Sequence, residues 1–262
     1  MVIAPHMDDE TLGCGMLLAE SSSRYSIHVI FATDGSKSPE TPHREVQASD
    51  PTAASLTAAR EAEALQALAI LGVPHTHVEF LGFPDGALAR HADALRRIVV
   101  ERARALRPAY VLVPFRYDRH PDHLAVNRAV TAVRSAGQLA AQVVEYFVYT
   151  HWRLLRSGDV RDYLADEDVR RLFAEEAAAG KRAALACYRS QTTRYFEGQR
   201  RAILTDALID RVCREPETFL RHDPARNGRW GLARARRWVP LACRLEPALK
   251  RWKDVLLERF VA

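Results

Sequence analysis

Residues 1–15 read MVIAPHMDDETLGCG, a short apolar run followed by an imidazole, three carboxylates and two glycines. The apolar run predicts a buried strand at Met1–Ala4, and the pattern after it predicts a helix at Leu12–Ser22. A strand that passes directly into a helix is typical of a βαβ unit. In sheets built from such units, ligands bind beyond the carboxyl ends of the strands, and these charged side chains lie at such an end.

The same alternation continues through the first 150 residues and predicts a mostly parallel sheet. Further strands are predicted at Ile27–Thr33, Thr76–Leu81, Tyr110–Pro114 and Val143–Tyr149. Further helices are predicted at Pro51–Leu71, His91–Leu106 and Asp122–Ala136, the first with Asp50 as N-cap and Gly72 after its end. Beyond Trp152 the strand signal fades, and Asp159–Arg221 is expected to be mostly helical.

Composition excludes several classes of protein. Of 262 residues, 48% are hydrophobic and 27% charged, which is ordinary for a globular chain and unlike collagen, coiled coils or disordered segments. The four cysteines are too widely spaced for a CxxC metal site or a disulfide framework, so we expect a reducing compartment, the cytoplasm. No apolar stretch approaches the ~20 residues of a membrane span.

The net charge of +5 is concentrated at the C-terminus, where residues 221–262 hold 11 basic and 4 acidic side chains. We expect a main domain at 1–195 and a helical, basic extension at 196–262, with no nucleic-acid-binding face on the main body. The mixture of Trp and Arg in the extension allows weak contact with an anionic membrane surface or an acidic substrate. Packing of these tryptophans on the parent domain is the favoured interpretation.

Two clusters carry the chemistry. The first is His6 with the carboxylates at positions 8–10, which repel one another unless a cation is bound. A solvated acidic helix start is the alternative interpretation.

The second cluster is RYDRHPDH, residues 116–123, at the end of the predicted strand Tyr110–Pro114. If the first and fourth strands are neighbours, His123 faces His6 and Asp9, and two imidazoles with one carboxylate form an open, catalytic zinc site. Simple helix capping by the histidines is the alternative here.

The segments PHMDDETLGCG (5–15) and HPDH (120–123) resemble the two signatures of the N-acetylglucosaminyl-phosphatidylinositol de-N-acetylase and LmbE-like family. The resemblance extends to TDG (33–35), RE (60–61), FLGFPDG (80–86) and, more weakly, residues 181–191. It covers residues 1–195 and implies a Rossmann-like three-layer α/β fold. One departure is Met7, where the family usually has proline, which loosens the turn and removes no ligand.

By this resemblance, His6, Asp9 and His123 would bind Zn²⁺ or another divalent metal. Asp8 would be the general base, because an unligated carboxylate beside the metal can take a proton from the attacking water. The spacing alone does not distinguish Asp8 from Asp9 in these roles.

Other roles follow from the resemblance. His120 would hold the oxyanion or protonate the departing amine, and Asp122 would orient its ring. Arg60 and Asp85 would contact the substrate. A solvated arginine paired with Glu63 is the alternative for Arg60, and an ordinary turn is the alternative for Asp85.

The resulting hypothesis is a zinc-dependent hydrolase that removes the N-acetyl group from an amino-sugar conjugate. Glycans, pseudo-disaccharides, antibiotics and lipid-linked sugars all remain open as substrates. The alternative is a noncatalytic metal- or nucleotide-binding α/β module. No GxGxxG or GxxxxGK[ST] motif follows a predicted strand, and two histidines suit zinc better than magnesium.

Overall fold

The protein was analysed as a computed structural model that describes residues 1–37, 50–164, 168–197, 199, 201–222, 241–242 and 244–246. The strands are β1 (Val2–Ala4), β2 (Val29–Thr33), β3 (Val78–Phe83), β4 (Tyr110–Pro114), β5 (Gln142–Tyr146), β6 (Val169–Leu172) and β7 (Glu217–Arg221). The α-helices are α1 (Asp9–Ser21), α2 (Ala53–Ile70), α3 (Ala92–Leu106), α4 (Pro121–Ser135), α5 (Glu175–Leu185), α6 (Arg189–Thr192) and α7 (Asp206–Arg214). Short 3-10 turns are η1 (His75–His77), η2 (Leu88–His91) and η3 (Val160–Tyr163).

The strands form one seven-stranded sheet in the order β3-β2-β1-β4-β5-β7-β6. Strands β1 to β5 run parallel, whereas β7 is antiparallel to both β5 and β6. The first and fourth strands are neighbours, as expected. The chain order reverses between them, and this switch point is where α/β sheets bind ligands.

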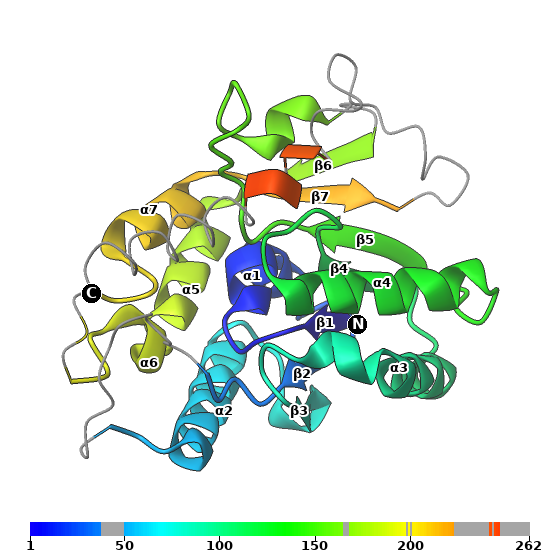
Figure 1. The fold of residues 1–262 in the computed structure, drawn as a ribbon, viewed down its shortest axis with the longest axis horizontal. Helices are drawn as coiled ribbons and strands as arrows, with labels where there is room; N and C mark the ends of the chain where they lie inside the picture. The colour runs from blue at the N-terminus through cyan, green and yellow to red at the C-terminus, as the bar shows by residue number, and fades with distance from the viewer. Residues whose placement is uncertain are drawn as a thin grey trace.

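Helices cover both faces of the sheet and make three layers (Figure 1). Helices α1, α2, α5 and α7 pack on one face around a core that includes Phe31, Leu68 and Tyr188. Helices α3 and α4 cover the other face around Ile3, Val99 and Val130. Strand β1 is buried in the middle, so the loop that follows it is held from both sides. The chain therefore has the predicted α/β architecture with a mostly parallel sheet.

Helix α1 approaches the sheet closely at its glycines. A Cβ atom on Gly13 would lie 2.3 Å from the Tyr146 ring of β5, which leaves no room for a side chain. A Cβ on Gly15 would lie 2.7 Å from the Lys181 side chain of α5. Cys14, between them, is fully buried in the core. The two glycines thus fix α1 against both the sheet and α5.

Several predicted boundaries were wrong. Helix α2 begins at Ala53 rather than Pro51, because the Thr52 hydroxyl caps it by accepting from the Ser55 N–H at 3.1 Å. Asp50, the predicted N-cap, instead accepts a hydrogen bond from the Glu197 N–H. Gly72 does follow the helix, with a left-handed φ of 79°.

The prediction that Asp159–Arg221 is mostly helical was wrong for β6 and β7. Strand β6 has the sequence VRRL and lies at the sheet edge, where charged side chains protect the exposed backbone and hide the hydrophobic signal. Strand β7 lies beyond the predicted domain boundary at residue 195, yet it pairs with β5. The expectation of a purely helical segment after residue 195 is therefore wrong for Glu217–Arg221.

Part of the C-terminal extension packs on the domain. Ala242 is fully buried in a cluster with Trp152, Phe115 and Leu220. The tryptophans and most of the arginines of the extension, and most of the polar loop after Asp34, lie outside the described residues. Among the helices that are described, none is long and apolar enough to cross a bilayer.

Candidate active site

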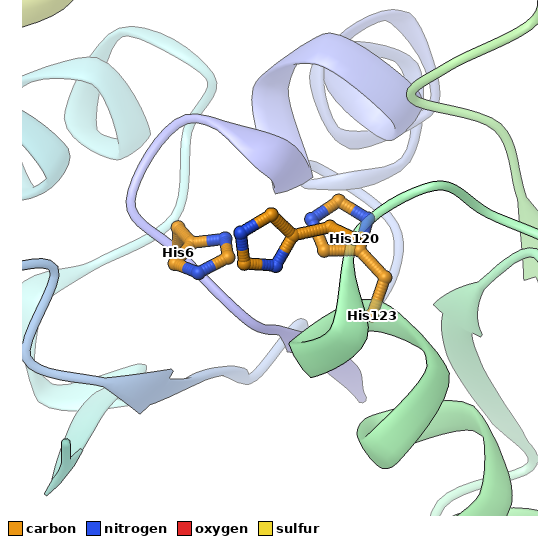
Figure 2. A group of neighbouring side chains, drawn as sticks. All are labelled: His6, His120 and His123. Atoms are coloured by element: carbon orange, nitrogen blue, oxygen red, sulfur yellow. The ribbon is translucent and has the colours of Figure 1, made fainter. Parts of the chain in front are cut away.

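The two predicted clusters meet at the switch point between β1 and β4. His6 lies in the loop after β1, and His120 and His123 lie at the start of α4, after β4 (Figure 2). Each imidazole offers a nitrogen atom, and these three nitrogens lie within 4.8 Å of one another. Figure 2 shows the three rings side by side, with His120 and His123 reaching toward His6 from the same helix start.

Asp9 joins the two histidines predicted as metal ligands. Its Oδ2 lies 3.1 Å from Nδ1 of His6 and 3.1 Å from Nε2 of His123. Zinc–ligand bonds of about 2.0–2.1 Å place neighbouring ligands of a tetrahedral ion roughly 3.3 Å apart. The Asp9 oxygen thus lies at this spacing from one nitrogen of each imidazole, and two imidazoles with one carboxylate fit the donor set of a divalent transition metal in their chemistry.

Asp118 holds the other side of the His123 ring, and it was not assigned a role from the sequence. Its Oδ1 lies 3.2 Å from Nδ1 of His123, and both side chains are almost completely buried. A carboxylate on the far nitrogen fixes the tautomer and orientation of a metal-binding imidazole. Burial opposes protonation of His123, but Asp118 and Asp9 outweigh it and raise the pKa of His123 to about 10.

Two more carboxylates approach His6 from the other side. Oδ1 of Asp85 and Oδ2 of Asp122 each lie 3.3 Å from His6 Nε2. Asp122 also accepts hydrogen bonds from the N–H groups of Gly86 and Leu88, so its position is fixed by the loop after β3. Although burial opposes it, these contacts hold the pKa of Asp122 below its usual range. Its carboxylate is 4.0 Å from His120 Nδ1, farther than from His6.

His120 caps α4 and also lines the site. Its Nδ1 accepts a hydrogen bond from the Asp122 N–H at 3.3 Å. Its ring lies 4.6 Å from the His6 ring in an edge-on arrangement. Burial, together with His6 and His123 nearby, lowers the pKa of His120 to about 4. His120 thus does both things that the sequence suggested as alternatives: it caps α4 and it lines the site.

Asp8 has an unusual backbone conformation, with φ of 137°. A non-glycine residue in this region costs roughly 1–3 kcal/mol, and such strain occurs mainly at functional sites. The surroundings hold it in place: the Asp8 N–H donates to Glu10, and the Arg60 guanidinium donates to the carbonyl of Met7 at 2.8 Å. Burial raises the pKa of Asp8 to about 7, although Arg60 opposes the shift.

Arg60 is almost fully buried, with 2% of its surface exposed. Besides Met7 it donates to the Gly35 carbonyl, and its Nη2 lies 3.7 Å from Asp8 Oδ1. The alternative of a solvated arginine paired with Glu63 is therefore wrong, since Glu63 instead accepts two hydrogen bonds from Ser190. The structure thus places the Arg60 guanidinium, which extends from α2, against the loop that carries Asp8.

Glu10 lies behind the site and is completely buried. It accepts hydrogen bonds from Tyr188, Thr11 and the Asp8 N–H. Burial raises the pKa of its carboxyl, with these hydrogen bonds opposing the shift. Its contact with the Asp8 N–H shows that it braces the backbone of Asp8. Tyr188 has no local sequence signal for its contact with Glu10.

A cleft with a volume of about 890 Å³ opens at this site. His6, Asp8, Asp9 and His120 line it together with the predicted substrate residues Arg60 and Asp85. Much of the rest of its wall comes from the segment after β5 and from the chain that runs from α6 through α7. That remainder includes Val148, Tyr149, Thr150, His151, Gln191, Gln199, Arg201, Ile203, Leu204 and Arg211.

Comparison with solved structures identifies proteins of the same fold. A conserved protein from Thermus thermophilus has 29% identity, with 72% of this chain and 78% of that one covered at a TM-score of 0.53. N,N'-diacetylchitobiose deacetylase from Pyrococcus horikoshii has 18% identity, coverage of 84% and 82%, and a TM-score of 0.60. A 4-carboxy-2-hydroxymuconate hydratase from Pseudomonas putida has 21% identity, coverage of 81% and 82%, and a TM-score of 0.50.

A comparison with curated proteins finds no match. The model of the PIG-L family, described as GlcNAc-PI de-N-acetylase, matches residues 1–134, which include both β1 and the start of α4. The matched half of the chain therefore contains the complete set of His and Asp side chains that meet at the switch point. On this match the chain belongs to the PIG-L (GlcNAc-PI de-N-acetylase) family.

Proposed function

We propose that this protein is a metal-dependent N-deacetylase that releases acetate and a free amine from an N-acetylglucosamine-type sugar or its conjugate. The observation that carries the proposal is the buried set of His6, Asp9 and His123 at the switch point, in which the Asp9 carboxylate lies 3.1 Å from a nitrogen of each imidazole. Membership of the PIG-L family supports the reaction type. A noncatalytic module would not need the strained backbone of Asp8 beside these three side chains.

Each side chain has a proposed part. His6, Asp9 and His123 would hold the ion, which when bound supplies Lewis-acid polarisation of the amide carbonyl and of water. Asp8, which lines the cleft and coordinates nothing in this scheme, would accept the proton of the attacking water.

Two further residues would act on the substrate and product. His120 would donate to the developing oxyanion or to the departing amine, and it lines the same cleft. Asp122 would orient His6 rather than the His120 ring, because its carboxylate lies closer to His6. Asp85, also in the cleft wall, would contact the sugar hydroxyl groups. Arg60 would act mainly by fixing the loop of Asp8, since its guanidinium is already bonded to two carbonyl groups.

Hydration of a carbon–carbon double bond is the second candidate reaction, because a hydratase shares the fold. A screen separates the two. Protein loaded with zinc is incubated with N-acetylglucosamine, its disaccharide and its glycosides, and with unsaturated dicarboxylic acids. The proposal predicts loss of an acetyl group by mass spectrometry together with free acetate. Uptake of water by an unsaturated acid, with no acetate from any sugar, would assign the hydratase reaction instead.

The proposal includes a reducing, cytoplasmic compartment. The three cysteines that the structure describes, Cys14, Cys187 and Cys213, are all free thiols, which such a compartment favours. The proposed partner is the sugar conjugate itself, and a nucleic acid is not expected.

A further inference from the structure

The cleft carries more positive than negative charge. Among the residues that the structure describes, its lining has the five cationic side chains of Lys37, Arg60, Arg119, Arg201 and Arg211, against the three carboxylates of Asp8, Asp9 and Asp85. A bound divalent metal would increase this excess. Residues 1–220 as a whole have slightly more acidic than basic side chains, so the excess is local to the cleft. Low-dielectric walls focus such a field on whatever enters.

Two of these cations already have partners. Arg60 is bonded to the loop of Asp8, as described above. Arg119 donates to Glu246 at 2.6 Å, and its guanidinium lies over the Trp152 ring at 4.6 Å. Within the part of the chain that the structure describes, no carboxylate pairs with Arg201 or Arg211. Both are exposed, so their guanidinium groups are available to a ligand in the cleft.

The wall that carries Arg201 is held in place. The Leu204 N–H donates to the Gln191 carbonyl at 2.9 Å, and the buried Gln199 side chain donates to the Arg201 carbonyl at 2.8 Å. Arg211 and Arg214 both belong to α7, but their side chains have different surroundings. Arg214 lies 4.0 Å from Asp210 and is absent from the cleft lining, whereas Arg211 lines it. The same helix therefore directs one arginine to the cleft and pairs another elsewhere.

We propose that Arg201 and Arg211 form a subsite for an anionic group, a phosphate or a carboxylate, on the part of the substrate attached to the acetamido sugar. The inference rests on the proposed function for the identity of the sugar. At about 890 Å³, the cleft is near the upper end of the ~300–1,000 Å³ range of ligand clefts and exceeds the needs of one sugar. Two planar guanidinium groups match the geometry of an oxyanion.

An anionic substituent also resolves a charge problem of the proposed reaction. The amine product is an ammonium ion near neutral pH, and a cleft with excess positive charge disfavours it. An anion on the same molecule, held by Arg201 and Arg211, offsets that repulsion. The apolar side chains of Ile203 and Leu204 lie in the same wall and would contact the linker between sugar and anion.

The test compares three glycosides of N-acetylglucosamine: the 1-phosphate, a carboxymethyl glycoside and the neutral methyl glycoside. The ratio of kcat/KM for each anionic probe to that for the neutral probe is measured in the native protein. The same ratio is measured in Arg201→Gln/Arg211→Gln and in the control Arg214→Gln. Calorimetry with the same glycosides gives Kd without relying on turnover, and thermal unfolding checks that each variant is folded.

We expect the anionic probes to be preferred, and we expect the double variant to reduce the ratio roughly 10- to 100-fold, because charge-assisted hydrogen bonds are lost. Arg214→Gln should keep the ratio of the native protein. Preference for the phosphate probe alone would identify a phosphate subsite, and preference for both a general anion subsite.

Equal kcat/KM for charged and neutral probes in the native protein, or an unchanged ratio in the double variant, would overturn the proposal. Absence of acetate from all three probes would instead reject the proposed function. Calorimetry then decides the subsite separately: arginine-dependent tighter binding of the anionic probes supports it, and equal binding rejects it.

Discussion

At the scale of single residues, Asp8 and Asp9 are adjacent in the sequence but have different surroundings. Asp9 contacts two imidazoles at 3.1 Å, whereas Asp8 lies 3.7 Å from the Arg60 guanidinium. The sequence spacing did not separate the two roles, and the geometry now supports Asp9 as the ligand and Asp8 as the base.

Replacement of each aspartate tests this division. Asp8→Asn should retain bound metal and lose activity by roughly 10²- to 10⁴-fold, because an amide cannot accept the proton. Asp9→Asn should lose metal. Metal content by plasma mass spectrometry and acetate release are measured on the same samples, and the reverse pattern would exchange the two roles.

Asp118 gives a second test at this scale, through its contact with the far nitrogen of His123. Asp118→Asn should weaken metal affinity roughly 10- to 100-fold, because the ring loses the carboxylate that orients it. Competition with a chelator measures the affinity. Asp93→Asn, an exposed position on α3, is the control and should leave affinity unchanged. An Asp118 variant with native affinity would show that the contact is not part of the metal centre.

The sequence predicted the side chains that meet at the switch point on the condition that the first and fourth strands are neighbours, and the sheet order meets that condition. It gave no role to Asp118, although that residue lies within the second motif. Residues in a loop follow no helical or strand repeat, so the sequence does not show which neighbour a loop carboxylate contacts. The direction of the Asp122 carboxylate toward His6 was likewise not predictable, since it depends on the N–H groups of Gly86 and Leu88 in a distant loop.

At the scale of elements, α1 is tied to the rest of the fold by a buried ion pair. Lys181 of α5 donates to Glu217 of β7 at 2.9 Å and to the Leu12 carbonyl at 2.7 Å. Glu217 also accepts hydrogen bonds from the N–H groups of Met16 and Leu17. Both charged side chains are almost completely buried. The helix that carries Asp9 is therefore fixed by charges from two other elements.

Removal of one partner leaves the other charge buried and unpaired. Lys181→Met should lower the free energy of unfolding by about 3–5 kcal/mol. Adding Glu217→Gln to Lys181→Met should recover part of this loss, because the amide is neutral and its one oxygen can still accept from one of the two α1 N–H groups. Urea unfolding measures all variants. The exposed neighbour Arg182→Ala is the control, with an expected loss below about 1 kcal/mol. Additive effects of the two substitutions would show that the pair is not coupled.

The elements that sequence analysis missed share one property. Strands β6 and β7 are only four and five residues long, and both contain charged residues. The partners of these charged residues are known only once the chain has folded, so the sequence pattern does not show them. Glu217 illustrates the problem: a glutamate in a buried strand contradicts the hydrophobic pattern, and its reason is Lys181, 36 residues away. The parallel strands β1 to β5 were predictable because four of the five are buried over most or all of their length.

At the scale of the whole molecule, residues 241–246 connect the C-terminal part of the chain to the site. Glu246 accepts hydrogen bonds from Arg119, next to His120, and from the Leu154 N–H. Together with the burial of Ala242, this supports packing on the domain for this piece of the extension. Membrane contact by the remaining residues stays a prediction.

Two truncations separate packing from membrane binding. Ending the chain after residue 228 should remove the packed piece and lower Tm, by roughly 2–4 °C for each kcal/mol lost. Ending it after residue 246 keeps Ala242 and Glu246 and should retain Tm. Sedimentation with anionic and neutral vesicles is measured on the same proteins. Salt-sensitive binding to anionic vesicles, abolished by truncation without any change in Tm, would favour the membrane interpretation.

The whole account depends on a metal held by His6, Asp9 and His123, and acetate release with controlled metal content tests it most directly. Protein stripped with a chelator, the same protein reloaded with zinc, and His123→Ala treated alike are each incubated with an N-acetylglucosamine glycoside. The account predicts close to one metal per chain in the reloaded protein, acetate release only in that sample, and loss of both metal and activity in His123→Ala. Full activity in the stripped protein, or native metal content and activity in His123→Ala, would contradict it.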